Sequence, residues 1–194
     1  MKTMILASGN THKIEEFQDC LPDYKVKSLR DIGFEDDIDE TGTTFEENAI
    51  IKAHAIVQFL KKKKMTAAFV VADDSGLCVD ALGGAPGIYS ARYSGNHDSA
   101  ANREKLLKEL SGKKNRDAHF ACVLVKMKMD ESYKVYEGRV DGKILTEERG
   151  DNSFGYNSLF YSNDLQKTFG EASIEERTRV SHRGRAIEKL KKDL

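Results

Sequence analysis

Two adjacent aspartates, Asp73 and Asp74, follow an apolar run over residues 67–72. Ser75 and Gly76 come directly after them. The run predicts a buried strand that ends at the two carboxylates, and ligands of α/β proteins bind outside the carboxyl ends of such strands. Two carboxylates beside a hydroxyl suit a hard cation such as Mg²⁺ and a water molecule to be activated. The alternative is a solvated turn, because Asp and Ser are common turn residues.

A second candidate site is the turn between the strand predicted over residues 3–7 and the helix that follows it. The turn reads Ser8, Gly9, Asn10, Thr11, His12 and Lys13. Gly9 permits a close backbone approach, a helix N-terminus offers N–H groups to an anion, and Lys13 adds a positive charge in the first turn. These features suit a phosphate group. The Walker A spacing is absent, however, and turns with Gly and Asn are common where no phosphate binds.

An acidic loop over residues 35–40 could supply further oxygen ligands. Asp39 and Glu40, at its end, could join Asp73 and Asp74 around one Mg²⁺ that also contacts substrate phosphates. Without other information, a run of carboxylates in a loop is more typical of a solvated surface.

A basic segment surrounds the start of the last predicted helix, for which Ser181 is the expected N-cap. Its basic residues are Arg177, Arg179, His182, Arg183 and Arg185. Cations at a helix start oppose the helix dipole, so the segment needs either an anion or exposure to water. Guanidinium groups can donate to a phosphate or to a purine carbonyl.

An aromatic segment precedes this basic one and consists of Phe154, Gly155, Tyr156 and Asn157. A ring beside a glycine could stack on a nucleotide base. Taken in isolation, the pattern is more typical of aromatic residues in a core.

The rest of the pattern indicates the elements that must hold these residues. Strands are predicted over residues 3–7, 25–29, 67–72, 118–127, 134–140 and 158–161. Thr44 and Glu47 have the spacing of a capping box and open a long helix, and Ser99 is the expected cap of a later one. Helices between the early strands and consecutive strands later predict a mixed α/β sheet, with two lobes around a cleft.

The composition excludes several classes of function. The 194 residues include 31 basic and 32 acidic side chains, so no overall field points to nucleic acid as a partner. No apolar run is long enough to span a membrane, and the N-terminal segment lacks the pattern of a signal peptide. The three cysteines, Cys20, Cys78 and Cys122, form no CxxC pair and predict reduced thiols in the cytoplasm.

Taken together, these segments strongly resemble the inosine/xanthosine triphosphate pyrophosphatase family, also called Ham1-like. The matching stretches are SGNTHKIEEF, ETGTTFEENAIIKA, ADDSGLCVDALGGAPGIYSARYSG, SFGYNSLF, KTFGEASIEER and SHRGRA. They occur in the family's order, and the resemblance runs from Ile5 almost to the C-terminus.

The resemblance implies an elongated mixed sheet flanked by helices, with two lobes and a central substrate cleft, in one domain over residues 1–194. It also implies hydrolysis of ITP, dITP and XTP between the α and β phosphates, which gives the monophosphate and pyrophosphate and cleanses the nucleotide pool. Such enzymes require Mg²⁺ and are usually homodimers.

The resemblance also implies a role for each matching residue. Asp74 corresponds to the general base and a metal ligand, and Asp39 or Glu40 to a second metal ligand. Substrate contacts fall on Ser8, Gly9, Asn10, Thr11, His12, Lys13, Ser75, Phe154, Gly155, Tyr156, Asn157, Arg177, His182 and Arg183. The first six would bind the triphosphate, and His182 with Arg183 would contact the purine edge. Asp73 is expected to hold the turn, because neighbours on an extended chain point to opposite sides.

Three departures from the family pattern fall at the base end. Where the family usually reads GFGYDP, residues 153–158 of this chain read SFGYNS, with Asn157 in place of Asp and Ser158 in place of Pro. Arg177 stands in place of the usual Lys. An amide can also pair with adenine, so either weaker base selectivity or a lower rate is expected. Two alternatives remain: a Maf-like pyrophosphatase of pyrimidine or modified nucleotides, and a nucleotide-binding protein with degraded catalysis.

Overall fold

The computed structural model describes residues 2–152 and 154–194, without the side chain of His12. The strands within this part of the chain are β1 (Lys2–Leu6), β2 (Tyr24–Lys27), β3 (Phe69–Val79), β4 (Asp117–Met127), β5 (Tyr133–Ile144), β6 (Phe160–Ser162) and β7 (Lys167–Thr168). The helices are α1 (Thr11–Cys20), α2 (Phe45–Lys62), α3 (Ser99–Glu109), α4 (Ile174–Val180) and α5 (His182–Lys191). Shorter 3-10 turns are η1 (Arg30–Ile32), η2 (Asp80–Leu82) and η3 (Gly87–Arg92).

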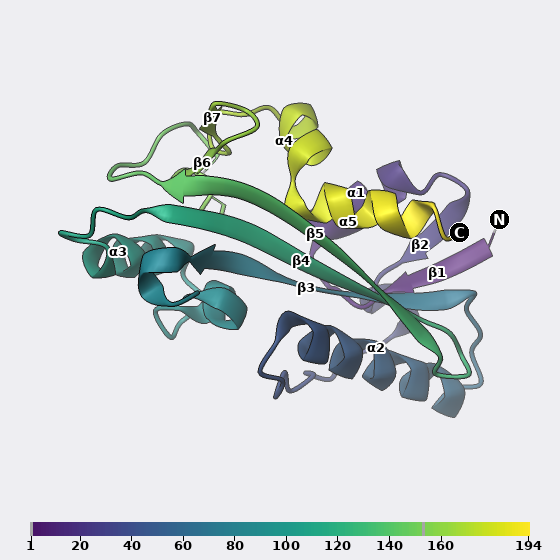
Figure 1. The fold of residues 1–194 in the computed structure, drawn as a ribbon. Coiled ribbons are helices and arrows are strands. Elements are labelled where there is room, and N and C mark those ends of the chain that lie inside the picture. The colour runs from purple at the N-terminus through teal and green to yellow at the C-terminus, as the bar shows by residue number, and fades with distance from the viewer. Residues whose placement is uncertain (1, 153) are drawn as a thin grey trace. The chain divides into compact units, whose positions relative to one another are not determined.

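The strands form a mixed sheet with the order β2-β1-β3-β4-β5-β6-β7 (Figure 1). Strand β1 is parallel to β2 and β3, whereas β6 is antiparallel to β5 and β7. Helices flank the sheet, which confirms the predicted α/β fold class.

Contacts divide the chain into two compact units. The first comprises Met1–Asp74, Val123–Glu137 and Ala186–Leu194, and the second comprises Ser75–Cys122 and Gly138–Arg185. Each unit has its own apolar core. The first core lies between α2 and strands β1, β3 and β4. The second combines β3, β4, β5 and α3 with a cluster of aromatic rings.

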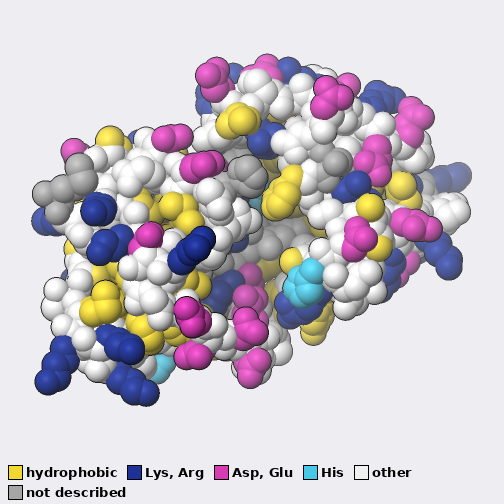
Figure 2. Space-filling view, turned by 180° about the vertical axis from the view of Figure 1, so that it is seen from behind, with side chains coloured by type: hydrophobic (Ala, Val, Ile, Leu, Met, Phe, Trp, Pro, Cys, Tyr) yellow, Lys and Arg dark blue, Asp and Glu magenta, His cyan; other side chains and the backbone are white. Residues whose placement is uncertain are grey.

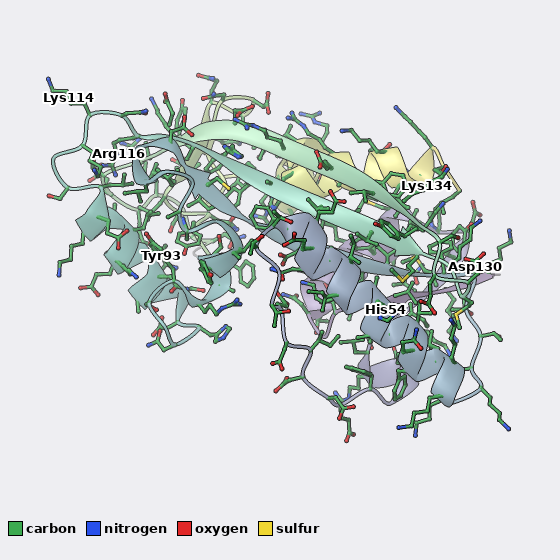
Figure 3. The ribbon with its side chains drawn as sticks, turned by 60° about the horizontal axis from the view of Figure 1, so that its bottom comes forward. His54, Tyr93, Lys114, Arg116, Asp130 and Lys134 are labelled. Carbon is green, nitrogen blue, oxygen red and sulfur yellow. The ribbon has the colours of Figure 1, made fainter. Side chains whose placement is uncertain are left out.

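Helix α2 covers one face of the first unit's sheet. Ala49, Ala53, Ile56 and Leu60 are fully buried, as their spacing predicts. Figure 3 shows His54 on the same helix lying toward the β4–β5 turn, where its imidazole is 3.2 Å from the carboxylate of Glu131.

The start of α2 differs in detail from the predicted capping box. Thr44 accepts a hydrogen bond from the Glu47 backbone N–H at 3.1 Å, as expected. The Glu47 carboxylate, however, returns to the backbone N–H of Thr43 at 2.6 Å. The reciprocal box occurs instead on α4, between Ser173 and Glu176. At α3, Asp98 rather than Ser99 is the N-cap.

Strand β3 is longer than predicted and does not end at the aspartates. It continues to Val79, because Leu77 and Val79 are buried in the second unit's core. Strand β1 ends earlier, with Leu6 opposite Val71. Asp73 and Asp74 therefore lie just beyond the carboxyl end of β1 rather than at the end of their own strand.

The described part of the chain also bears on the membrane and thiol predictions. None of its helices combines the length and the apolar character that crossing a membrane requires. Cys20 and Cys78 are free thiols, and Cys122 is buried. Figure 2 shows basic and acidic side chains interspersed on the face in view, in agreement with the balanced charge.

Candidate active site

The two aspartates lie on opposite faces of β3. Asp73 is 3% exposed and Asp74 is 9% exposed, so neither belongs to a solvated turn. Side chains alternate along a strand, and Val70 and Ala72 face the core under α2. Asp74 has the same parity and meets α2, whereas Asp73 faces the side of α1. The expectation that Asp73 holds a turn is wrong, because the chain continues as a strand.

Asp74 is paired with Lys52, a residue for which the sequence predicted no role. Lys52 Nζ is 3.1 Å from Asp74 Oδ1 and 3.2 Å from Glu40 Oε1. The lysine and aspartate side chains are only 11% and 12% exposed. Of the two loop acids, Glu40 therefore lies beside this pair, whereas Asp39 is exposed.

A signal for Lys52 was present in the sequence. It lies three residues after Ala49 and four before Ile56, so it falls on the stripe of α2 that faces the core. A lysine in that position needs an acidic partner inside the protein, because a buried ammonium is otherwise costly.

The pKa shifts of Asp74 and Lys52 suit a carboxylate base beside a lysine that stays charged. Burial raises the pKa of Asp74 above its ordinary value; Lys52 opposes this shift, and Glu40 adds to it. Burial lowers the pKa of Lys52, but Asp74, Asp73 and Glu40 together raise it above its ordinary value. Asp74 is therefore a stronger base than an exposed aspartate, while Lys52 keeps its charge.

One oxygen of Asp74 remains available for a ligand. Asp74 Oδ2 is buried and has no hydrogen-bond partner among residues 2–152 and 154–194. Since an unsatisfied buried oxygen is costly, this atom points to a water molecule, a cation or a substrate group.

The carboxylates fit Mg²⁺ in combination with a phosphate. In the described part of the chain, no group of three or more His, Cys, Asp or Glu side chains could hold a metal ion. Mg²⁺ often takes only one or two carboxylates and completes its shell with water and phosphate oxygens. Asp74 Oδ2 and the Glu40 carboxylate are donors of this kind.

Asp73 carries the second lysine contact. Lys13, in the first turn of α1, forms an ion pair with Asp73 Oδ1. The Lys13 side chain is 23% exposed, whereas that of Asp73 is 1% exposed. The buried aspartate thus fixes a lysine whose side chain is still partly exposed.

The turn before α1 is built as a helix start. Asn10 O accepts from the Ile14 backbone N–H at 3.1 Å, and the Asn10 side chain accepts from the Lys13 N–H at 3.4 Å. Ser8 Oγ accepts from the Asn10 N–H at 3.1 Å. A Cβ atom added at Gly9 would meet nothing within 4 Å, so the space above this backbone is open. Thr11 begins α1, and the side chain of His12 lies outside the described structure.

In the second unit, two predicted substrate contacts meet each other. Arg183 Nη2 donates to Ser75 Oγ at 3.2 Å, which links the start of α5 to β3. The ring of His182 stacks on Phe120, with centroids 4.9 Å apart and planes 15° from parallel. The core therefore fixes the orientation of this imidazole.

His182 and Arg183 follow directly on the close junction between α4 and α5. Ser181 Oγ accepts from the Gly184 N–H at 2.9 Å, so Ser181 caps α5 as predicted. A Cβ atom at Gly184 would lie 2.0 Å from the carbonyl oxygen of Thr178, which requires glycine there. Arg177, on α4, donates to the carbonyl of Phe169 at 3.4 Å.

The aromatic segment divides into an exposed ring and a buried one. Phe154 is 62% exposed, whereas Tyr156 is 3% exposed and its hydroxyl donates to the Ser90 carbonyl at 2.8 Å. Gly155, between them, has φ +58°. Asn157 Nδ2 donates to Asn152 Oδ1 at 3.4 Å. Phe154 is therefore the exposed ring of the segment, and Tyr156 anchors the segment in the core. The departure at Ser153 lies outside the described residues.

Comparison with known proteins gives a consistent result over the whole length. The sequence model of the Ham1 family matches residues 4–193. The dITP/XTP pyrophosphatase of Bacillus subtilis (strain 168) is 47% identical, covering 99% of this chain and 96% of the relative. That of Clostridium perfringens is 46% identical, with 100% and 98% covered.

Two solved structures agree with these relatives. The Staphylococcus aureus Ham1 protein has a TM-score of 0.89 at 43% identity, covering 99% of this chain and 97% of that one. A HAM1 protein from Coxiella burnetii has a TM-score of 0.90 at 36% identity, with 100% and 98% covered.

Proposed function

Because the chain belongs to the Ham1 family, we propose that it hydrolyses deaminated purine nucleoside triphosphates (ITP, dITP and XTP) between the α and β phosphates. The products are the monophosphate and pyrophosphate, and the reaction removes these nucleotides from the pool. One observation carries the chemistry. Asp74 combines a raised pKa with a buried oxygen that has no partner in the described chain.

Asp74 is the general base of this proposal. A carboxylate with a raised pKa takes a proton from water more readily than an ordinary one, and burial holds it in a fixed orientation. The water would then attack the α phosphorus. The ammonium groups of Lys52 and Lys13 offset the charge of the triphosphate, which the α1 N-terminus and residues Ser8 to Lys13 bind.

Mg²⁺ is the proposed cofactor, held by Asp74 and Glu40 together with the phosphates. When bound, it would lower the pKa of a coordinated water and neutralise phosphate charge. Asp39 is the less favoured ligand, because it is exposed and Glu40 contacts the Lys52 ammonium.

The second unit is proposed to bind the base. Phe154 would stack on the purine, while Arg183 and His182 would donate to its carbonyl at position 6. Adenine presents an amine at that position, so these donors would be left without partners. A site whose polar groups are left unpaired by the wrong substrate can discriminate against that substrate by roughly four orders of magnitude. Ser75, Gly155, Tyr156, Asn157 and Arg177 complete the proposed contacts.

We further propose that residues 1–194 act as one domain. The resemblance supports a homodimer, and the balanced charge and the short apolar runs support a cytoplasmic protein with no nucleic-acid or membrane partner. Light scattering during gel filtration tests the dimer.

Pyrophosphate release from ITP in the presence of Mg²⁺ is the decisive assay. Asp74→Asn should abolish release, because an amide cannot take the proton. Asp117→Asn, at an exposed aspartate of the second unit, is the matched control and should retain activity. Binding of ITP without release would favour a nucleotide-binding protein. Preference for pyrimidine substrates in a panel with XTP, dITP, GTP and ATP would favour a Maf-like enzyme.

A further inference from the structure

A buried arginine ties the aromatic segment to α3. Arg103 is 7% exposed, although it is charged and lies on a helix at the surface of the second unit. Its Nη1 donates to the Gly155 carbonyl at 3.0 Å, and its Nε is 3.0 Å from Glu148 Oε1. The guanidinium therefore bridges a backbone carbonyl and a carboxylate, an arrangement that its planar fork of donors favours.

The Glu148 carboxylate also contacts the end of the aromatic segment, at Ser158. Glu148 Oε2 accepts from Ser158 Oγ at 2.7 Å, and Ser158 is fully buried. Partial burial raises the pKa of Glu148, but the hydrogen bond from Ser158 and the pairing with Arg103 outweigh it and hold the pKa below its ordinary value. Glu148 is thus ionised at neutral pH, and both of its hydrogen bonds are charge-assisted.

These contacts enclose a short turn, from Gly155 to Ser158, that directly follows the exposed ring of Phe154. The turn has two further ties: Tyr156 donates to the Ser90 carbonyl at 2.8 Å, and the Asn157 carbonyl accepts from the Gly170 N–H at 2.8 Å. Phe154 itself is 62% exposed. The backbone of Phe154 therefore runs directly into a turn that one set of contacts, from Arg103 through Glu148, holds at Gly155 and at Ser158.

We propose that Arg103, Glu148 and Ser158 are positioning residues that hold Phe154 in the orientation that receives the nucleotide base. The inference rests on the proposed function, because it assumes that this turn meets the base. None of the three residues needs to touch the substrate. Their effect is transmitted through the Gly155 carbonyl and the Ser158 hydroxyl.

Steady-state kinetics with ITP tests the proposal. Ser158→Ala removes the hydroxyl, and Glu148→Gln removes the charge. Each should raise KM for ITP about five- to tenfold while kcat stays within about twofold, since one charge-assisted hydrogen bond is lost far from the reacting phosphate. Ser158→Thr keeps the hydroxyl and should have the wild-type KM for ITP. Glu147→Gln, at the neighbouring glutamate whose side chain is 73% exposed, is the control and should leave both constants unchanged.

Two readouts separate positioning from a merely structural role. The double variant of Ser158→Ala and Glu148→Gln should raise KM no more than the more affected single variant, because both remove the same link. Inorganic triphosphate, which has no base, should inhibit every variant with the wild-type Ki. A lower Tm with unchanged KM, or equal changes in KM and in the triphosphate Ki, would overturn the proposal.

Failure of the proposed function is distinguishable from failure of this inference. If the wild-type protein binds ITP without releasing pyrophosphate, hydrolysis fails, and the same comparisons are made with Kd from calorimetry in place of KM. Weaker ITP binding in Ser158→Ala and Glu148→Gln would then still support positioning. A wild-type protein that neither binds nor hydrolyses ITP would overturn both.

Discussion

Lys52 Nζ lies 3.1 Å from Asp74 Oδ1, so a cation on α2 is paired with the carboxylate proposed as the general base. The pair joins α2, which packs on the core, to the middle of β3. Because the two pKa values depend on each other, a change at the lysine should be visible in the behaviour of the aspartate.

Lys52→Met should lower kcat/KM for ITP by about two orders of magnitude, because one cation facing the phosphates is lost. The pH dependence should also change. The reaction needs ionised Asp74, so kcat/KM falls as the pH drops through the pKa of this group. Without Lys52 nothing opposes the effect of burial, the pKa rises further, and the acidic limb moves to higher pH.

The control for this change lies on the same helix. Lys61→Met removes an ammonium whose side chain is 41% exposed and which pairs with Glu131, away from the aspartates. Its pH profile should match that of the wild type. An unshifted acidic limb in Lys52→Met would contradict the assignment of Asp74 as the titrating base.

Two glycine-to-alanine substitutions should have opposite consequences. A Cβ atom at Gly9 meets nothing within 4 Å, so Gly9→Ala should leave Tm unchanged yet raise KM for ITP if a phosphate approaches this backbone. At Gly184 the Cβ would lie 2.0 Å from Thr178 O, so Gly184→Ala should be destabilising by about 1–3 kcal/mol. Thermal unfolding and ITP kinetics on both variants give the comparison. A wild-type KM in Gly9→Ala would exclude close phosphate contact there.

Asn157→Asp should sharpen the choice of base. The amide of Asn157 can pair with the acceptor N1 of adenine, whereas a carboxylate accepts only and favours the protonated N1 of hypoxanthine. The ratio of kcat/KM for ITP to that for ATP should rise by about tenfold. Equal ratios in the wild type and the variant would remove Asn157 from the list of selectivity determinants.

Asp193 should stabilise the first unit in a pH-dependent way. Lys126, Lys134 and the Tyr136 hydroxyl all bond to its carboxylate and hold its pKa far below its ordinary value of 3.8. A carboxyl with a depressed folded-state pKa contributes stability above its unfolded pKa and loses it as the pH falls toward the folded value. Asp193→Asn should therefore lower Tm at pH 7.

The difference in Tm should shrink as the pH falls below about 4, where the unfolded chain begins to take up the proton. Asp23→Asn, at an exposed aspartate, should give the wild-type Tm at both pH values. A loss in Asp193→Asn that is equal at pH 7 and pH 3 would mean that packing, rather than charge, holds the C-terminus.

Local patterns were enough to predict the family and the mixed sheet. They failed where structure depends on distant partners. The strand with the aspartates was predicted to stop at residue 72, because Asp and Gly disfavour strands; its extension to Val79 depends on a neighbouring strand and a second core. Strand β7 and helix α4 are too short for a clear periodic signal.

In the candidate site, too, residues with a local sequence pattern could be predicted, whereas contacts between distant residues could not. Lys13 could be predicted from its turn, but its pairing with Asp73 joins residues 60 positions apart. Lys52 required knowledge of which helix face is buried. The link from Arg103 through Glu148 to Ser158 spans 55 residues of sequence and leaves no local pattern at all.

The alternation along β3 has a consequence for how this chain can change in length. Val70 and Ala72 set the face on which Asp74 meets Lys52, and the intervening positions set the face on which Asp73 meets Lys13. An insertion or deletion of one residue between Val70 and Asp73 would move each aspartate to the face of β3 that the other now occupies, and so separate both from their lysines. This part of β3 therefore tolerates substitution of one apolar residue by another, but not a change in the number of residues.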